Sequence, residues 1–350
     1  MVELVRKRVT SFDVAQATGL SQPTVSRALR NDERITPETV RKVRNTAAAL
    51  GYVPSDRARD LSSGSTHRVA MVVNLDNSLW SLLVGRLHDQ LAVHGYRLTL
   101  LAAHGDPVGV ESQVLGGGVD GVIISTTTLD SQLPLTLHRA GIPTVLLNRF
   151  TEGSSNPGNP RGSQVDASVG DNFGGGELAA HMLLNAGHRE IGALFGPKDT
   201  STGRDREAGF RRTILGSSTA LERRWIRHGD FTYGHGFTGV HALFESGAVP
   251  SALFCANDMI ALGALNAAHE LGLKVPDDLA LIGFDDLDFT AWPRNSLSTI
   301  AIPFDDLIQT AVAMLLERIG GFTGRGRRVI HPVMAVPRKT HTSTTVGADR

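Results

Sequence analysis

Two kinds of hydrophobic pattern divide the chain. Up to residue 51, apolar residues recur at spacings of three and four, which is the period of an amphipathic helix. Val40, Val43, Ala47 and Leu50 form the clearest such stripe. From residue 68 onward, short continuous apolar runs alternate with helical stretches, as is typical of parallel sheets covered by helices on both faces. The pattern predicts a small all-α head followed by an α/β core.

The head carries start and stop signals for three helices. Thr10, Ser21 and Thr36 each stand where an N-cap residue is expected, and Gly19 is a suitable C-cap for the first helix. Pro23 falls in the first turn of the second helix, where its missing N–H costs nothing. The turn over residues 19–21 joins two short helices. This is the helix-turn-helix arrangement, whose second helix enters the major groove of DNA.

The core pattern is that of a doubly wound α/β fold, long enough for two subdomains. Strands are expected over residues 69–73, 98–102, 122–124, 144–147, 191–195, 252–255 and 279–283. Helices are expected over residues 79–94, 174–186, 204–215, 237–245, 258–271 and 304–319. Ligands of such folds bind beyond the carboxyl ends of the strands, so polar and aromatic residues that follow those ends are candidate ligand contacts.

Charge separates the two parts. Residues 1–61 hold eleven Lys and Arg against seven Asp and Glu, although the whole chain has formal net charge zero. We therefore expect only the head to bind phosphate. The single cysteine, Cys255, excludes an intrachain disulfide. No apolar run approaches the roughly 20 residues of a membrane span, and the start of the chain lacks a signal-peptide pattern, so we expect a soluble, cytoplasmic protein.

Long strings in both parts are similar to one protein family. VTSFDVAQATGLSQPTVSRAL (residues 9–29) and TPETVRKVRNTAAALGYVPSDRARDL (residues 36–61) closely resemble the headpiece of LacI/GalR transcriptional regulators. In the core, GIPTVLLNR, ALFCANDMIALGAL and LALIGFDD resemble the effector domain of that family. The resemblance implies a headpiece over residues 1–54, a hinge helix and linker over residues 55–67, and a periplasmic-binding-protein-like core of two subdomains over residues 68–350.

The resemblance also implies roles in DNA binding. It places base-reading side chains at Gln22, Pro23 and Arg27, phosphate or backbone contacts at Thr10, Ser21, Thr24, Ser26, Arg30 and Arg57, and a minor-groove wedge at Leu61. Pro23 stands where many relatives carry a hydrogen-bonding side chain, and Arg30 where Asn is common. Because of these two departures, the resemblance does not define the exact operator sequence.

The same resemblance assigns a small-molecule site. It implies effector contacts at Asn77, Trp80, Arg149, Phe173, Arg206, Asn257, Phe284 and Asp285. An internal ion pair between Arg206 and Asp285 is the alternative for those two residues. Asp258 is expected to cap its helix. Ser78 replaces the proline that the family usually has, and residues 151–164 form a loop longer than the family pattern.

These features predict a repressor that binds double-stranded operator DNA as a homodimer or a higher oligomer, under the allosteric control of a small polar ligand. A sugar is the expected ligand, and a nucleobase or nucleoside is the alternative. A solute-binding receptor would share the core but not the head. No nucleophile–base set, cofactor fingerprint or metal-ligand cluster is present in the sequence, so we expect neither an enzyme nor a bound cofactor or metal.

Overall fold

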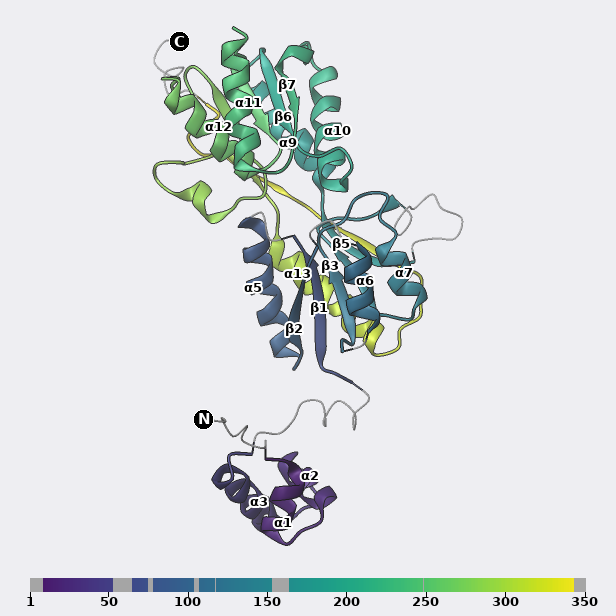
Figure 1. Ribbon diagram of the computed structural model, residues 1–350. Coiled ribbons are helices and arrows are strands. Elements are labelled where there is room, and N and C mark those ends of the chain that lie inside the picture. The colour runs from purple at the N-terminus through teal and green to yellow at the C-terminus, as the bar shows by residue number, and fades with distance from the viewer. Residues whose placement is uncertain are drawn as a thin grey trace, which may run out of the picture. The chain divides into compact units, whose positions relative to one another are not determined.

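The computed structural model describes residues 9–52, 65–74, 78–103, 107–116, 118–152, 164–247 and 249–342. The chain separates into two compact units, residues 1–67 and residues 68–350 (Figure 1). The hinge expected over residues 55–61, with Arg57 and Leu61, lies outside the described residues, as do Asn77 and most of the 151–164 loop.

The first unit contains α1 (Ser11–Thr18), α2 (Gln22–Leu29) and α3 (Pro37–Ala49). Ser21 and Thr36 cap the second and third helices by accepting a bond from the amide three residues on, at 3.4 Å each. Gly19 ends α1 in the left-handed conformation, with φ 68°, which glycine adopts without strain. The expected helix-turn-helix is therefore confirmed.

A small shared core holds these three helices together. It consists of Val14, Ala15, Val25, Ala28, Val43 and Ala47. Leu50 was expected in the same stripe but is 40% exposed, because it lies beyond the last turn of α3. Tyr52 packs against the core from the segment that follows.

The second unit has two lobes, each built on a parallel sheet (Figure 1). The first sheet has the strand order β11-β5-β4-β3-β1-β2. Its strands are β1 (Arg68–Val73), β2 (Arg97–Ala102), β3 (Gly121–Ile124), β4 (Thr144–Leu147), β5 (Asp166–Gly170) and β11 (Arg328–His331). The helices of this lobe are α5 (Ser78–Val93), α6 (Pro107–Leu115), α7 (Leu133–Arg139) and α13 (Phe304–Ile319).

Alternation along β1 shows that both faces of this sheet are covered. Val69, Met71 and Val73 belong to the apolar cluster that includes α5 and α13. Ala70 and Val72 belong to the opposite cluster, with side chains of α6 and α7. A strand buried on both faces must be apolar at every position, which is why its sequence is a continuous run.

The second lobe has the strand order β7-β6-β8-β9. It comprises β6 (Ile191–Phe195), β7 (Ile226–His228), β8 (Ala252–Cys255), β9 (Ala280–Ile282), α9 (Asn172–Asn185), α10 (Ser201–Leu215), α11 (Tyr233–Glu245) and α12 (Asp258–Glu270), with the short 3-10 helices η1 (Arg223–Trp225) and η2 (Asp288–Ala291). The antiparallel pair β10 (Thr299–Ala301) and β12 (Met334–Val336) lies outside both sheets. The chain crosses between the lobes after β5, β10 and β11.

Glycines set the distance between α9 and α10. A Cβ on Gly176 would collide with the carbonyl oxygen of Arg206, and one on Gly209 would collide with that of Phe173. Gly176 therefore serves close packing of the two helices, besides its place in the Gly174–Gly176 run at the helix start. This packing fixes the position of α10, and with it Arg206. Among the described residues, no helix is long and apolar enough to cross a membrane.

Candidate functional site

The exposed side of α2 carries three of the side chains expected to meet DNA. Pro23, Arg27 and Arg30 are all exposed. The Arg27 guanidinium makes no hydrogen bond or ion pair with the described residues, so its planar fork is available for two parallel bonds to a guanine edge. Arg30 donates from Nε to the carbonyl of Ser26 at 3.3 Å.

The other expected DNA contacts surround the start of α2 and α1. Ser21 and Thr24 share a hydroxyl–hydroxyl bond of 2.8 Å. Gln22 donates from Nε2 to Ser11 Oγ at 3.2 Å, which links the two helices. Thr10 is exposed and donates its hydroxyl to Asp13 at 2.8 Å. These contacts hold the recognition helix in place while leaving its outer face open.

In the core, strand ends from both lobes enclose a small cavity. Its volume is about 20 Å³. The lining residues are Leu79, Trp80, Asn148, Arg149, Thr202, Arg206, Phe231, Asn257 and Asp285. The cavity thus brings together five of the expected effector contacts, namely Trp80, Arg149, Arg206, Asn257 and Asp285. The volume is that of about one water molecule, so the side chains already fill most of the space between the lobes.

Arg206 is held by three hydrogen bonds. Its Nε donates to Asn172 Oδ1 at 2.8 Å, Nη1 to the carbonyl of Ala256 at 2.7 Å, and Nη2 to Asp285 Oδ1 at 2.8 Å. A guanidinium has five N–H groups, so two remain for a ligand. The internal ion pair that the sequence allowed does form, and it forms in the wall of the cavity.

Asp285 occupies a strained backbone conformation. Its φ is 114°, in the left-handed region that favours glycine. The conformation is held because its amide donates to the carbonyl of Ile300 at 2.8 Å. Burial raises the pKa of the Asp285 carboxyl, and the charge of Arg206 opposes that rise. Among the described residues Oδ2 has no hydrogen-bond partner, which leaves an acceptor for a ligand.

Asn257 combines two roles at the start of α12. Its Oδ1 accepts the amide of Ile260 at 2.9 Å and so caps the helix. Its Nδ2 makes only a long 3.5 Å contact with the carbonyl of Phe231, so it remains available to donate to a ligand. Asp258 is therefore not the cap that the sequence suggested. Its buried carboxylate accepts from the Leu287 amide at 2.8 Å and the Thr299 hydroxyl at 2.6 Å.

Two polar atoms at the end of β4 are buried without a partner among the described residues. They are Asn148 Oδ1 and Arg149 Nε. The Arg149 guanidinium lies 5.8 Å from the ring centre of Trp80 and 5.9 Å from that of Phe231. Burial, together with the charge of Arg206, lowers the pKa of Arg149 to about 10. An unsatisfied acceptor and an unsatisfied donor on consecutive residues are suited to hydroxyl groups, which both donate and accept.

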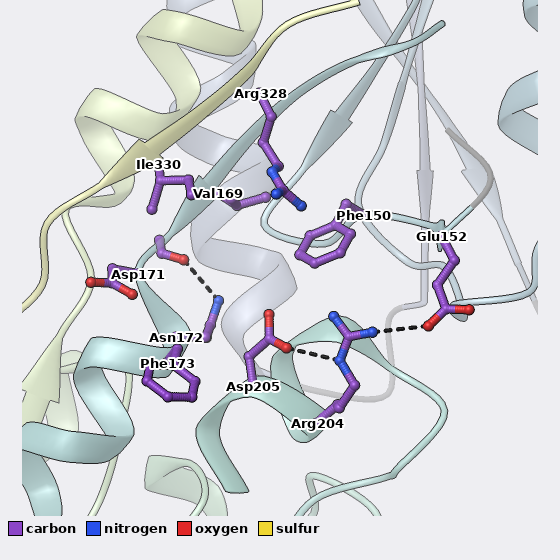
Figure 2. Close-up of a pocket in the computed structure, with 11 residues that line it drawn as sticks. Phe150, Glu152, Val169, Asp171, Asn172, Phe173, Arg204, Asp205, Arg328 and Ile330 are labelled. Atoms are coloured by element: carbon purple, nitrogen blue, oxygen red, sulfur yellow. Dashed lines mark hydrogen bonds and ion pairs between the residues drawn. The ribbon is translucent and has the colours of Figure 1, made fainter. Parts of the chain in front are cut away.

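Two expected contacts lie away from the cavity. Phe284 is fully buried behind Arg206, whose guanidinium carbon lies 3.8 Å from the ring centre. Phe173 lines a separate pocket (Figure 2).

The structure also adds residues to the expected effector contacts. Phe231 and Asn148 line the cavity itself, and Asn172 positions Arg206. Asn148 directly follows a predicted strand, which was the available signal. Phe231 follows the three-residue strand β7, whose Ile-Arg-His sequence gives no apolar run.

Family models match both parts of the chain. A model described as bacterial regulatory proteins, lacI family, matches residues 12–55, and a periplasmic binding protein-like domain matches residues 180–341. The HTH-type transcriptional regulator CelR of Thermobifida fusca is 30% identical over 336 residues, covering 93% of this chain and 96% of that protein. The HTH-type transcriptional repressor PurR of Pectobacterium carotovorum subsp. carotovorum is 30% identical over 316 residues, covering 89% and 90%.

Solved structures agree with this assignment. The lac repressor dimer bound to operator and the anti-inducer ONPF has a TM-score of 0.84 and 27% identity, covering 96% of this chain and all of that one. The CelR–cellobiose complex has a TM-score of 0.70 and 28% identity, covering 95% of this chain and all of that one. With a helix-turn-helix head and a two-lobed core that both match, the chain belongs to the LacI family of bacterial transcriptional regulators.

Proposed function

We propose that this regulator is a repressor whose operator affinity is set by a sugar bound between the two lobes of the core. In this proposal residues 1–54 read the operator, residues 55–67 connect the parts, and residues 68–350 bind the sugar and form the dimer. The observation that carries the proposal is the cavity in which Arg206, Asp285 and Asn257 converge with free hydrogen-bonding capacity. We assign these groups to binding and not to catalysis.

The mixture of free donors and acceptors favours a polyhydroxylated ligand. Arg206 has two N–H groups to spare, and Asn257 offers its amide N–H. Asp285 Oδ2 and Asn148 Oδ1 are acceptors. Neighbouring hydroxyls on a sugar ring donate to one group while they accept from the next. One sugar ring can therefore satisfy both the free donors and the free acceptors of the cavity.

The aromatic residues favour a sugar over a nucleobase. A planar base needs a free ring face on which to stack. Here Arg149 lies over both Trp80 and Phe231, and Arg206 lies 5.6 Å from the ring centre of Phe231. Guanidinium groups therefore already occupy these faces. Because PurR repressors are among the relatives, a nucleobase is the alternative ligand against which the sugar is tested.

Binding must enlarge the cavity. Ligand sites commonly measure about 300–1,000 Å³, far more than the space enclosed here. A ligand that contacts both lobes shifts their equilibrium only by its differential affinity. We expect coupling to the operator on the order of 1–3 kcal/mol, equal in both directions.

The experiment combines calorimetry with operator binding. Operator sites are first selected from random DNA with the purified protein. Cellobiose, a panel of monosaccharides, hypoxanthine and guanine are then titrated with and without that DNA. We expect a sugar to bind one site per chain, with an affinity that changes when DNA is present. Arg206→Met should abolish binding, whereas Arg212→Met, on the same helix with a 72% exposed side chain, should not. Tight binding of a base would contradict the sugar proposal, and so would failure of every probe to bind.

A further inference from the structure

A second pocket, of about 420 Å³, lies on the side of the core where β5 and β11 approach α10 (Figure 2). Phe150 and Val169 line it from the first lobe, and Phe173 and Asp205 from the second. Its volume is in the range of small-molecule sites. It shares none of its lining residues with the cavity around Asp285.

Two guanidinium groups flank the Phe150 ring in this pocket, and they differ in how they are paired. Arg204 lies 5.5 Å from the ring centre and Arg328 lies 4.6 Å from it. Arg204 is neutralised by Asp205 at 2.8 Å and by Glu152 at 3.0 Å. Arg328 is partly buried, and its guanidinium has no hydrogen bond or ion pair with the described residues. Burial lowers the pKa of Arg328.

Asp205 faces Arg328 across the pocket without touching it. In Figure 2 the Asp205 carboxylate points up from α10 and the Arg328 guanidinium points down from β11. No ion pair joins the two side chains. Asp205 Oδ1 accepts from Arg204 Nε, so Oδ2 remains open toward the pocket. A carboxylate oxygen and an unpaired guanidinium thus stand on opposite sides of an empty volume.

The charged side chains that line this pocket limit the class of ligand that it can bind. Glu152, Asp171 and Asp205 outnumber Arg204 and Arg328 in the lining, so a simple anion would meet a net negative wall. A simple cation would leave the partly buried Arg328 uncompensated, and a neutral polyol would not supply the charge that a desolvated guanidinium requires. A molecule with a carboxylate at one end and an ammonium at the other satisfies both sides.

We propose that this pocket binds a small zwitterion of the α-amino-acid class. The ligand carboxylate pairs with Arg328 in the two-bond geometry that guanidinium groups favour. The ligand ammonium pairs with Asp205. The ligand side chain packs against the partly exposed Phe173 and Ile330, which give that end of the pocket its apolar wall.

One residue links this pocket to the cavity around Asp285. Asn172 lines the pocket and donates from Nδ2 to the Gly170 carbonyl at 3.0 Å. Its Oδ1 accepts from Arg206 Nε at 2.8 Å. A zwitterion in the pocket would therefore contact both lobes and lie beside the residue that positions Arg206.

The test is calorimetry and saturation-transfer NMR of the full chain with each of the twenty standard amino acids, and with citrate and glycerol as an anion and a polyol. We expect at least one amino acid to bind with a dissociation constant below 1 mM, on the order that a few charged contacts supply. Asp205→Asn keeps an oxygen for Arg204, and Arg328→Gln keeps a donor. Each should weaken binding at least tenfold, whereas Arg325→Gln, exposed and outside the pocket, should not.

A second arm uses the unaltered protein and so does not depend on the folding of any variant. The N-acetyl derivative of the bound amino acid lacks the ammonium, and its amide lacks the carboxylate. Both derivatives should bind at least tenfold more weakly. Failure of every amino acid to bind, binding that both derivatives retain, or displacement by citrate or glycerol would overturn the proposal. None of these results depends on whether a sugar binds in the other cavity.

Discussion

Arg206 and Asp285 form an ion pair of 2.8 Å in which each side chain is only 2% exposed. The pair joins α10 to the turn after β9. Phe284, the neighbour of Asp285, lies directly behind the guanidinium at 3.8 Å. A pair buried this deeply contributes little net stability, because desolvation of both charges offsets their attraction, yet removal of one partner is costly. We interpret it as a preformed ligand contact and not as a stabilising device.

This relationship predicts a non-additive mutant cycle. Arg206→Met should destabilise the core by about 3–5 kcal/mol, because it leaves the Asp285 carboxylate buried and unpaired. The double variant Arg206→Met, Asp285→Leu should recover at least half of that loss, since both charges are then absent. Urea unfolding of the two variants and of Asp285→Leu measures the coupling. A double variant no more stable than Arg206→Met would show that packing, and not charge, dominates the site.

The recognition helix offers a matched pair of variants. Arg27 is exposed and unpaired among the described residues, whereas Arg30 bonds to the helix backbone. Arg27→Ala should weaken operator binding by about 1–3 kcal/mol and relax base preference at one position per half-site. Arg30→Ala should weaken all sequences alike and reduce the salt dependence by about one phosphate contact.

Fluorescence anisotropy against the selected operator and its single-base variants separates these two effects. If Arg27→Ala retains the base preference of the parent at every position, the contact between Arg27 and a base is wrong. If Arg30→Ala changes the preference at one position, Arg30 reads a base and not the phosphate backbone.

We expect Arg149 to lower the stability of the unliganded core and to strengthen sugar binding. Burial lowers its pKa to about 10, which means that the folded state holds this charge at a cost at neutral pH. Arg149→Met should therefore stabilise the unliganded core, by about 1–2 kcal/mol because the side chain keeps some exposure to water. The same substitution removes a donor from the cavity and should weaken sugar binding. Urea unfolding at pH 7 and calorimetry check both parts, and a loss of stability would contradict the assigned cost.

The sign of the pH dependence follows from the same shift. The folded pKa of about 10 lies below the ordinary value of a guanidinium, so above pH 10 the unfolded chain binds the proton more readily than the folded chain. The stability of the parent relative to that of Arg149→Met should rise as the pH rises above 10, and it should be constant at lower pH. A difference between the parent and the variant that shrinks as the pH rises toward 12 agrees with this account.

Most of the strands that were predictable are buried on both faces, although the edge strand β2 was predicted too. β1 and β6 are continuous apolar runs because neither face meets water. β5 was missed, since Asp-Ala-Ser-Val-Gly is fully buried through small and polar side chains that other residues satisfy. Its Asp166 accepts bonds from Arg318 and Arg327, which lie far along the chain. No local pattern reports such a partner.

The cavity was predictable to the extent that strand ends meet at one edge of a sheet. That rule brought Trp80, Arg149 and Asp285 together from separate segments. It does not give the direction of a side chain within a turn. Phe284 and Asp285 are adjacent in sequence, yet one packs behind Arg206 and the other lies in the cavity wall. The positive φ of Asp285 produces this difference, and a non-glycine residue gives no sign of it in the sequence.

The close approach of α9 and α10 gives the last prediction. A Cβ on Gly209 would overlap the carbonyl oxygen of Phe173, which is backbone and cannot turn away. Gly209→Ala should push the two helices apart and destabilise the core by about 1–3 kcal/mol, as overpacked sites do. Because Arg206 lies one turn earlier on α10, the shift should also lengthen its bonds to Asp285 and Asn172 and weaken sugar binding.

The control is another glycine-to-alanine change in a helix. Gly234 in α11 has ordinary backbone geometry, and a Cβ there meets nothing within 4 Å. Gly234→Ala should leave sugar binding unchanged and stabilise the core by about 0.4–1 kcal/mol, because alanine reduces the conformational entropy of the unfolded chain. Thermal unfolding and calorimetry compare the two variants. If both are as stable as the parent or more so, the helices have room to separate, and the glycine contact does not fix the position of Arg206.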